Sequence, residues 1–200
     1  MGLDEEFTLR TDEGERTARS ALIPPRLPHQ LIAHGRRMAF CYLDAARDCR
    51  DLMRTTGGSV HYGHAREAEL LRCGEVRTWL EIAGRGPVAP DDPRIAAALE
   101  LLRTADLSAA ELATRVHLST SRFLHLFAQH AGTTFRRYRL WGRMLRTASG
   151  YAAGADLTTA ATDAGFASPS HFSTAFRAMF GLSPSLLLAT GTPRASFELL

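Results

Sequence analysis

The C-terminal half of this 200-residue chain uses one sequence template twice, and this repeat constrains the fold more than any other feature. Each copy reads Ser, three residues, Phe, three residues, Phe, four residues and Gly. The first copy runs from Ser119 to Gly132, and the second runs from Ser168 to Gly181, 49 residues further along the chain. Nearly every other position differs between the copies. The repeat therefore predicts one structural unit used twice, with variable positions that are free for separate tasks.

Each copy of the template is expected to form a capped helix. Serine is a preferred N-cap residue, and glycine is a preferred residue just after a helix ends. Residues four apart lie on the same face of a helix, so the two phenylalanines of a copy share one face. We expect this face to be packed against a scaffold rather than to contact a ligand. The expected core anchors are Phe123, Phe127, Phe172 and Phe176.

The positions two, three and six residues after each cap point away from the phenylalanine face. They carry short or planar hydrogen-bonding side chains, which suit the reading of base edges in a DNA major groove. The alternative is that these positions form an ordinary solvated face. Because the same pattern of hydrogen-bonding side chains occurs in both copies, DNA recognition is favoured. Leu124 also lies on the outward face, where it either meets a thymine methyl group or packs on the next helix. The candidate base-contacting residues are Ser121, Arg122, Leu124, His125, Ser170, His171, Ser173 and Thr174.

The positive charge of the chain is concentrated in its C-terminal half. All 24 basic residues are arginine; residues 1–92 carry a net charge of −2 and residues 93–200 a net charge of +5. Between Glu111 and Asp156 the chain has seven arginines and no carboxylate. Such a field points to an anionic partner, most simply phosphate. The candidate phosphate-contacting residues are Arg136, Arg137, Arg139, Arg143 and Arg177.

The hydrophobic pattern divides the chain into two regions. Residues 16–43 have a strand-like pattern broken by prolines and a glycine, and the segments 44–55 and 65–83 have helical periodicity. The segment GRGPVAPDDP, rich in glycine and proline, follows and is expected to be a linker. Beyond it the pattern is wholly helical. The expected organisation is an N-terminal region at 1–83, a linker at 84–92, a helical domain at 93–190 and a tail at 191–200.

The segment from about Pro93 to Leu188 resembles the DNA-binding domain of the AraC/XylS family of bacterial transcription regulators. The resemblance rests on the ELA run at Glu111–Ala113, on the repeated template, and on the stretch DAGFASPSHFSTAFRAMFGLSP at Asp163–Pro184. It implies two helix-turn-helix units joined by a long helix, and double-stranded DNA as the partner. His117 stands where the family usually has glycine in the first turn. If that turn needs a positive φ, His tolerates it less well than Gly.

The N-terminal run ALIPPRLPHQLIAHGRRMAFCYLD resembles the closing strands of the cupin-like barrel that family members use as an effector sensor. The helices after it resemble a dimerisation pair. Only about 43 residues precede the first expected helix, so either the barrel is trimmed to a partly open sheet or the true start codon lies upstream. The resemblance adds a small-molecule effector, a homodimer and RNA polymerase as expected partners.

These observations predict an α+β protein with a small N-terminal β-rich, partial cupin-like region plus helices, followed by an all-α tandem helix-turn-helix domain. The expected function is sequence-specific DNA-binding transcription regulation, with two recognition helices in successive major grooves. A helical protein–protein adaptor, which would need exposed phenylalanines, is the alternative. A cupin-type metal enzyme with a helical tail is a weaker one.

The sequence contains no combination of residues typical of an enzyme. No nucleophile–base pair, phosphate-binding loop or three-ligand metal set is present, so neither a catalytic site nor a metal or other cofactor is expected. His29, His34, His61 and His64 are expected to be structural or solvated, and the three cysteines are expected to be reduced. No apolar run approaches the roughly 20 residues that a membrane span needs. Because the N-terminus lacks a signal-peptide pattern, a cytoplasmic protein is expected.

Overall fold

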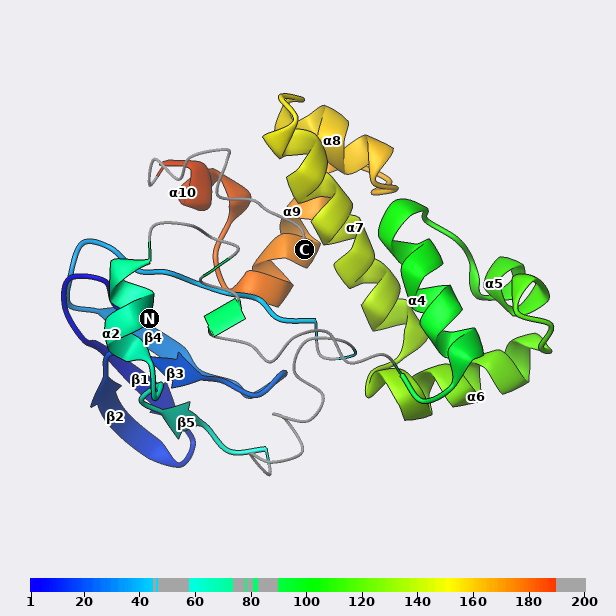
Figure 1. Ribbon diagram of the computed structural model, residues 1–200. Helices are drawn as coiled ribbons and strands as arrows, with labels where there is room; N and C mark the ends of the chain where they lie inside the picture. Colours follow the sequence, from blue (N-terminus) through cyan, green and yellow to red (C-terminus); the bar gives the residue numbers. More distant parts are fainter. Residues whose placement is uncertain (45, 47–57, 74–77, 79–80, 83–89, 190–200) are drawn as a thin grey trace. The chain divides into compact units, whose positions relative to one another are not determined.

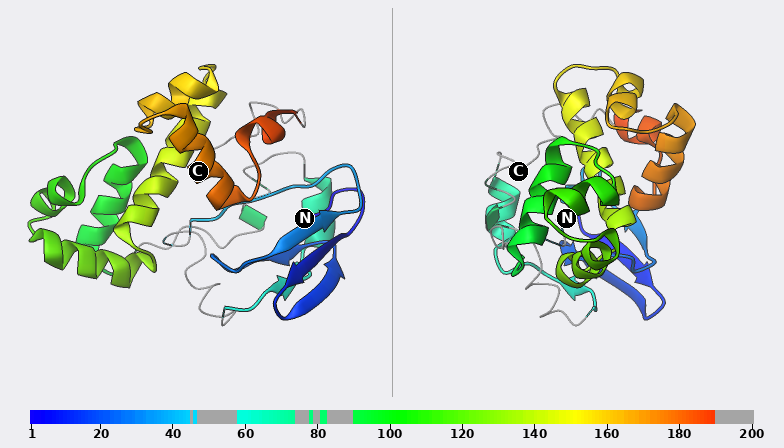
Figure 2. Two further views of the ribbon diagram at one scale, coloured as in Figure 1. Left: turned by 180° about the vertical axis from the view of Figure 1, so that it is seen from behind. Right: turned by 90° about the vertical axis from the view of Figure 1, so that its right-hand side faces the viewer.

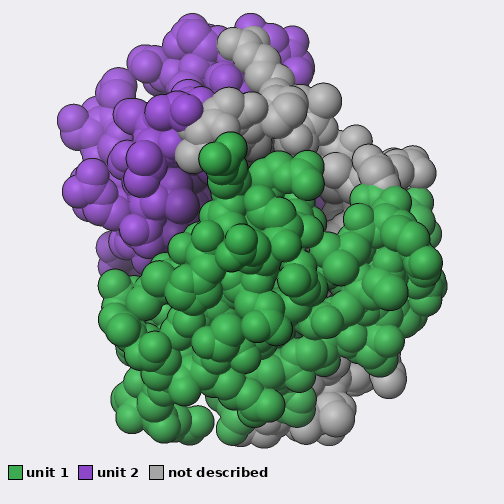
Figure 3. Space-filling view, turned by 90° about the vertical axis from the view of Figure 1, so that its left-hand side faces the viewer, with its two compact units in different colours: residues 1–89 green, residues 90–200 purple. Residues whose placement is uncertain are grey.

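The computed structural model describes residues 1–44, 46, 58–73, 78, 81–82 and 90–189. The chain divides into two compact units, Met1–Ala89 and Pro90–Leu200 (Figure 3). Most of the helix expected at 44–55, part of the segment 65–83, most of the expected linker and the tail lie outside the described residues.

The N-terminal unit is built on a small antiparallel sheet with strand order β2-β1-β4 (Figure 1). Phe7 and Leu9 of β1 alternate with polar residues and are fully buried, so one face of this strand supplies the core. A second, two-stranded sheet pairs β3 with β5. The elements are β1 (Phe7–Thr11), β2 (Gly14–Ala18), β3 (Ala21–Leu22), β4 (Gln30–Ala33), β5 (His61–Tyr62) and helix α2 (Glu67–Arg72).

The sequence predicted this sheet only in part. Strand β1 lies in the acidic N-terminal segment, where two apolar residues among charged ones did not indicate a strand, although its neighbours β2 and β4 pair with it on both sides. The strand-like pattern of residues 16–43 also predicted a strand across residues 36–43, and this prediction is wrong. The segment contributes a single β-bridge, between Gly2 and Met38. Backbone hydrogen bonds hold this segment instead: the Leu3 N–H donates to the Arg37 carbonyl, and the Ala39 N–H donates to the Met1 carbonyl.

The C-terminal unit is helical, as the sequence predicted. Helix α7 runs through it, with α4 and α6 packed towards one end and α8 at the other, as the views in Figures 1 and 2 show. Helix α5 packs on α6, and α9 packs on α8. The elements are α4 (Pro93–Thr104), α5 (Ala109–Arg115), α6 (Thr120–Ala131), α7 (Phe135–Ala152), α8 (Leu157–Asp163), α9 (Pro169–Phe180) and α10 (Pro184–Ala189).

The two copies of the template form α6 and α9, with the caps that the sequence predicted. The Ser119 hydroxyl accepts a hydrogen bond from the Arg122 N–H at 3.3 Å, and the Ser168 hydroxyl accepts one from the His171 N–H at 3.1 Å. Both helices end at a left-handed glycine, with φ of 65° at Gly132 and 77° at Gly181. The repeated serine and glycine therefore set the length of each helix.

The phenylalanines of the template anchor each helix in a separate core. Phe123 and Phe127 are fully buried, and their rings lie 5.5–5.6 Å from those of Phe135 and Tyr138 in α7. Such edge-on aromatic pairs stabilise a core beyond the area that they bury. Truncating a buried phenylalanine typically costs about 3–5 kcal/mol.

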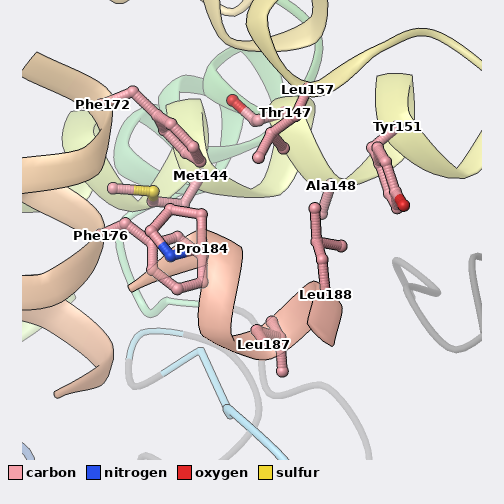
Figure 4. Close-up of a pocket in the computed structure, with 10 residues that line it drawn as sticks. All are labelled: Met144, Thr147, Ala148, Tyr151, Leu157, Phe172, Phe176, Pro184, Leu187 and Leu188. Carbon is pink, nitrogen blue, oxygen red and sulfur yellow. The ribbon is translucent and has the colours of Figure 1, made fainter. Parts of the chain in front are cut away.

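The second core is less completely closed than the first. Phe172 is buried against Phe166, with ring centroids 5.2 Å apart, whereas Phe176 is only partly buried at the edge of this core. A hollow of about 40 Å³ lies beside Met144, between α7, α9 and α10 (Figure 4). A hollow of this size is far smaller than the 300–1,000 Å³ of typical small-molecule sites, so it is a packing gap under α10.

The turns of the two helix-turn-helix units adopt one backbone shape. The Leu118 N–H donates to the Ala113 carbonyl at 2.9 Å, and the Phe166 N–H donates to the Ala161 carbonyl at 3.0 Å. In both turns the preceding residue is left-handed, with φ of 57° at His117 and 97° at Gly165. The first turn therefore does need a positive φ, and here a histidine adopts it.

We expect His117→Gly to stabilise the protein, because glycine adopts positive φ without the steric cost that an L side chain meets there. The expected gain in the free energy of unfolding is about 0.5–1 kcal/mol, after the greater flexibility of glycine in the unfolded chain is subtracted. Urea unfolding followed by circular dichroism measures it.

Gly165→Ala is the matched opposite change. It should destabilise, because its Cβ would lie 2.8 Å from Oδ2 of Asp106 as well as at positive φ. Destabilisation by His117→Gly would contradict the assignment of strain to the first turn.

Candidate nucleic-acid interface

The outward faces of α6 and α9 carry the side chains that the sequence singled out. All eight candidate base-contacting residues are exposed, and each face lies opposite the buried phenylalanines of its own helix. Both helices are thus held from behind and present hydrogen-bonding groups to solvent. A helix entering a major groove needs this arrangement.

Among the described residues of this unit, Leu124 and Leu186 are large apolar side chains that are exposed, and Leu124 has 40% of its surface accessible. The sequence left two roles open for it, contact with a thymine methyl group or packing on the next helix. Its exposure disfavours packing on α7. An exposed leucine between Arg122 and His125 adds an apolar contact point to a polar face, of the kind that a thymine methyl group would fill.

The His171 ring of α9 is held by a contact that the sequence did not reveal. It packs edge-on against the ring of Phe166 in the preceding turn, with centroids 5.4 Å apart. Phe166 is buried, whereas His171 is exposed. The turn of the second unit therefore orients a side chain on its outward face.

Three of the five arginines expected to contact phosphate are exposed. Within the described part of the chain, the structure shows no ion pair for Arg136, Arg137 or Arg177. Arg136 and Arg137 lie in the first turn of α7, whose N-cap is Thr134. The partial positive charge of a helix N-terminus adds to theirs, which favours an anionic partner at this end of α7.

Arg139 and Arg143 instead have a partner inside the protein. Both make two-pronged ion pairs with Asp106, with N–O distances of 2.7 Å for Arg139 and of 3.1 and 2.7 Å for Arg143. Arg146 reaches the same carboxylate at 3.4 Å. The stretch without carboxylates in the sequence is therefore partly neutralised in the fold, by an acid that precedes it in the chain. Part of the donor capacity of both arginines is therefore used within the protein, and their contact with phosphate stays a prediction.

Arg143 and Arg139 lower the pKa of the Asp106 carboxyl group. Burial by itself would raise its pKa, but hydrogen bonds from Arg143 and Arg139 outweigh that effect and hold the pKa below its usual value. The carboxylate is consequently charged at neutral pH, and its attraction for the guanidinium groups is fully present there.

Two histidines of the N-terminal unit, His29 and His34, have hydrogen-bond partners within that unit. His34 Nε2 lies 2.7 Å from the Thr8 hydroxyl, and His29 Nδ1 lies 2.7 Å from the Leu27 carbonyl. Among the described residues, no three His, Cys, Asp or Glu side chains gather as a metal site would require. No described helix has the length and apolar character of a membrane span.

Residues 112–190 match the model of a family described as a helix-turn-helix domain. The match begins inside α5 and includes α6, α7, α8 and α9. The chain contains an AraC-type helix-turn-helix domain. A domain of this type is a DNA-binding module, which supports DNA as a partner of the chain.

Two further comparisons accompany this match. The C-terminal domain of AraT, a response regulator from Geobacillus stearothermophilus, is a similar solved structure: it is 22% identical, with a TM-score of 0.45, over 50% of this chain and 86% of that one. No curated protein matches the chain.

We expect Asp106→Asn to destabilise the protein by about 1–3 kcal/mol at pH 7, because three partly buried guanidinium groups lose their counter-charge. The difference from wild type should shrink below about pH 4. A carboxyl group with a lowered folded pKa stabilises above its unfolded pKa, near 3.9, and this stabilisation is lost as the pH falls through the folded pKa. Urea unfolding between pH 7 and pH 3 measures the effect, and a constant difference would contradict it.

Proposed function

We propose that this protein is a sequence-specific transcription regulator that inserts α6 and α9 into successive major grooves on one side of a DNA duplex. The supporting observation is that two helices with equivalent caps and buried aromatic faces expose two sets of hydrogen-bonding side chains. The AraC-type domain, to which both helices belong, supports DNA as the partner.

In this proposal α6 supplies the stronger base readout. Arg122 can donate two parallel hydrogen bonds to a guanine, His125 can bond to a base edge, and Leu124 can contact a thymine methyl group. The side chains of α9 are shorter, and the ordered His171 ring is its main reader. A good arginine–guanine pair contributes about 1–3 kcal/mol of discrimination against the wrong base.

Arg136, Arg137 and Arg177 are the proposed phosphate contacts, since they are exposed and have no internal counter-charge among the described residues. We retain Arg139 and Arg143 only as secondary contacts, because the Asp106 carboxylate already accepts two hydrogen bonds, from Nε and Nη2, of each guanidinium group. Phosphate contacts set affinity and register, whereas base contacts set sequence preference.

A helical protein–protein adaptor is the competing function, and it requires the phenylalanines to form an exposed groove. Phe123 and Phe127 have no exposed surface, and Phe172 retains only 4%. Their burial favours DNA recognition by the opposite faces. The proposal also includes effector sensing and dimerisation by the N-terminal unit and contact with RNA polymerase, which rest on the family resemblance. It includes no enzymatic activity, because the sequence shows no combination of residues typical of an enzyme.

The proposal is tested first by selecting bound fragments from random duplex DNA with the purified full chain. Arg122→Ala should relax the preference at one base pair of the selected site, with a loss of about 5- to 150-fold for the preferred base, equivalent to about 1–3 kcal/mol. Affinity for sites that already lack that base should change little. Equal affinity of the variant and wild type for every sequence would contradict the role of Arg122.

Arg137→Ala should weaken binding to all sequences alike, because a phosphate contact carries no base information. The slope of log affinity against log salt should become shallower by about 1. Fluorescence anisotropy titrations at several salt concentrations measure both effects.

Arg94→Ala is the matched control for this experiment, since the guanidinium of Arg94 is already paired with Asp92 at 2.7 Å. It removes the same charge but should leave the slope unchanged. Equal slopes for Arg137→Ala and wild type would remove Arg137 from the interface.

A further inference from the structure

Asp106 lies in the segment between α4 and α5, two residues before Ser108, the N-cap of α5. Ser108 and Glu111 form a reciprocal capping box, with hydrogen bonds of 2.7 and 3.2 Å, so the start of α5 is tightly defined. Leu107, which lies between Asp106 and Ser108, is buried. The position of Asp106 is therefore coupled directly to the first helix-turn-helix unit.

Asp106 joins this unit to α7 through what we call the Asp106 cluster, which comprises Asp106, Arg139, Arg143 and Arg146. The guanidinium groups of Arg139 and Arg143, one turn apart on α7, each donate two hydrogen bonds to the Asp106 carboxylate. Paired arginine–carboxylate bonds define direction as well as distance. All four side chains are at most 30% exposed, so solvent screens these contacts less than it would surface ion pairs.

Arg146 extends the cluster to the second helix-turn-helix unit. Its guanidinium donates to the Leu102 carbonyl of α4 at 2.6 Å and to the Ala164 carbonyl at the end of α8 at 3.4 Å. One side chain of α7 therefore bonds to the backbone of α4, which packs on α6 of the first helix-turn-helix unit, and to the backbone of the second unit. Neither carbonyl belongs to a recognition helix, so the contact acts on the scaffold.

The turn between α8 and α9 also approaches the cluster closely. A Cβ added to Gly165 would lie 2.8 Å from Oδ2 of Asp106 and 3.3 Å from Nε of Arg143. The Arg143 guanidinium also lies 6.0 Å from the ring centroid of Phe166, within the range of a cation–π contact. Phe166 in turn contacts His171 on the outward face of α9. Contacts thus lead from the start of α5 to a proposed base reader on α9.

Few other contacts fix the position of the two helix-turn-helix units relative to each other. Each packs on its own section of α7, and among the described residues no extensive contact joins α4, α5 or α6 directly to α8 or α9. The relative position of the two recognition helices therefore depends on α7 and on the Asp106 cluster. Removing the carboxylate would leave three neighbouring positive charges that repel one another.

We propose that the Asp106 cluster fixes the placement of α6 relative to α9 and so sets the spacing between the two half-sites that the protein accepts on DNA. Asp106 is a positioning residue in this inference, which rests on the proposed function. Half-sites read by a pair of linked helices are constrained by the distance between those helices. The cluster would exclude sites whose halves are one or two base pairs closer or further apart.

The first test uses the site selected by the wild-type full chain, in a series of duplexes whose central spacer is shortened or lengthened by one and two base pairs. Wild type should lose affinity by about tenfold or more when the spacing changes, as for other disruptions of a specific site. Asp106→Asn should reduce this dependence to a few fold. It should also bind unrelated DNA as tightly as wild type or more tightly, because arginine side chains are released from the carboxylate.

Asp92→Asn is the matched control. Asp92 caps the start of α4 and pairs with Arg94. The same substitution there removes an ion pair in which no residue of α7 takes part. It should preserve the spacing profile of wild type. If Asp106→Asn also preserved that profile while remaining folded, the inference would be overturned.

The second test needs no DNA and separates this inference from the proposed function. Spin labels are placed at exposed positions away from the proposed contacts, through Ala128→Cys on α6 and Ala178→Cys on α9. The three native cysteines are replaced by serine in the same chain. Pulsed electron paramagnetic resonance spectroscopy then measures the distribution of distances between the two labels. Asp106→Asn should broaden or shift this distribution, whereas Asp92→Asn should not.

The two tests fail in different ways. A wild-type chain that selects no DNA would overturn the proposed function and, with it, the role in half-site spacing. An unchanged label distribution in Asp106→Asn would overturn the structural role of the cluster even if DNA binding were confirmed. Full support requires a changed distribution together with a weakened spacing preference.

Discussion

The packing of paired phenylalanines behind each recognition helix is the interaction on which the C-terminal unit depends. Phe123 and Phe127 are buried against Phe135 and Tyr138 of α7, and Phe172 is buried against Phe166. Because a helix that buries one face must expose the opposite one, this packing determines which side chains face solvent. The proposed reading of DNA by α6 and α9 therefore follows from the position of their hydrophobic faces.

Electrostatics divides the arginines of α7 into two groups with different tasks. Arg136 and Arg137 in the first turn are exposed, whereas Arg139, Arg143 and Arg146 surround Asp106. The first group can neutralise phosphate, and the second group holds the scaffold together. A single helix thus combines two exposed arginines at its start with an internal ion cluster, and the charge that DNA would meet is smaller than a count of arginines suggests.

Local signals made much of the C-terminal unit predictable. The repeated serine and glycine identified the ends of α6 and α9. The sequence left the backbone conformation at His117 open, and the structure shows that its φ is positive. Strand β1 was missed because two buried residues in an acidic segment form too short a pattern, and only pairing with β2 and β4 makes it a strand. The resemblance to a cupin-like barrel stays a prediction, and so do the roles of the eight outward residues.

The sequence by itself determined the two helix-turn-helix units, because caps, turns and helical periodicity act between residues a few positions apart. It also determined which face of each recognition helix is apolar. The tertiary structure alone decided where the carboxylate of Asp106 lies, since it meets arginines that are 33 to 40 positions away along the chain. Charge compensation acts through distance in space, and no linear pattern of charges records that distance.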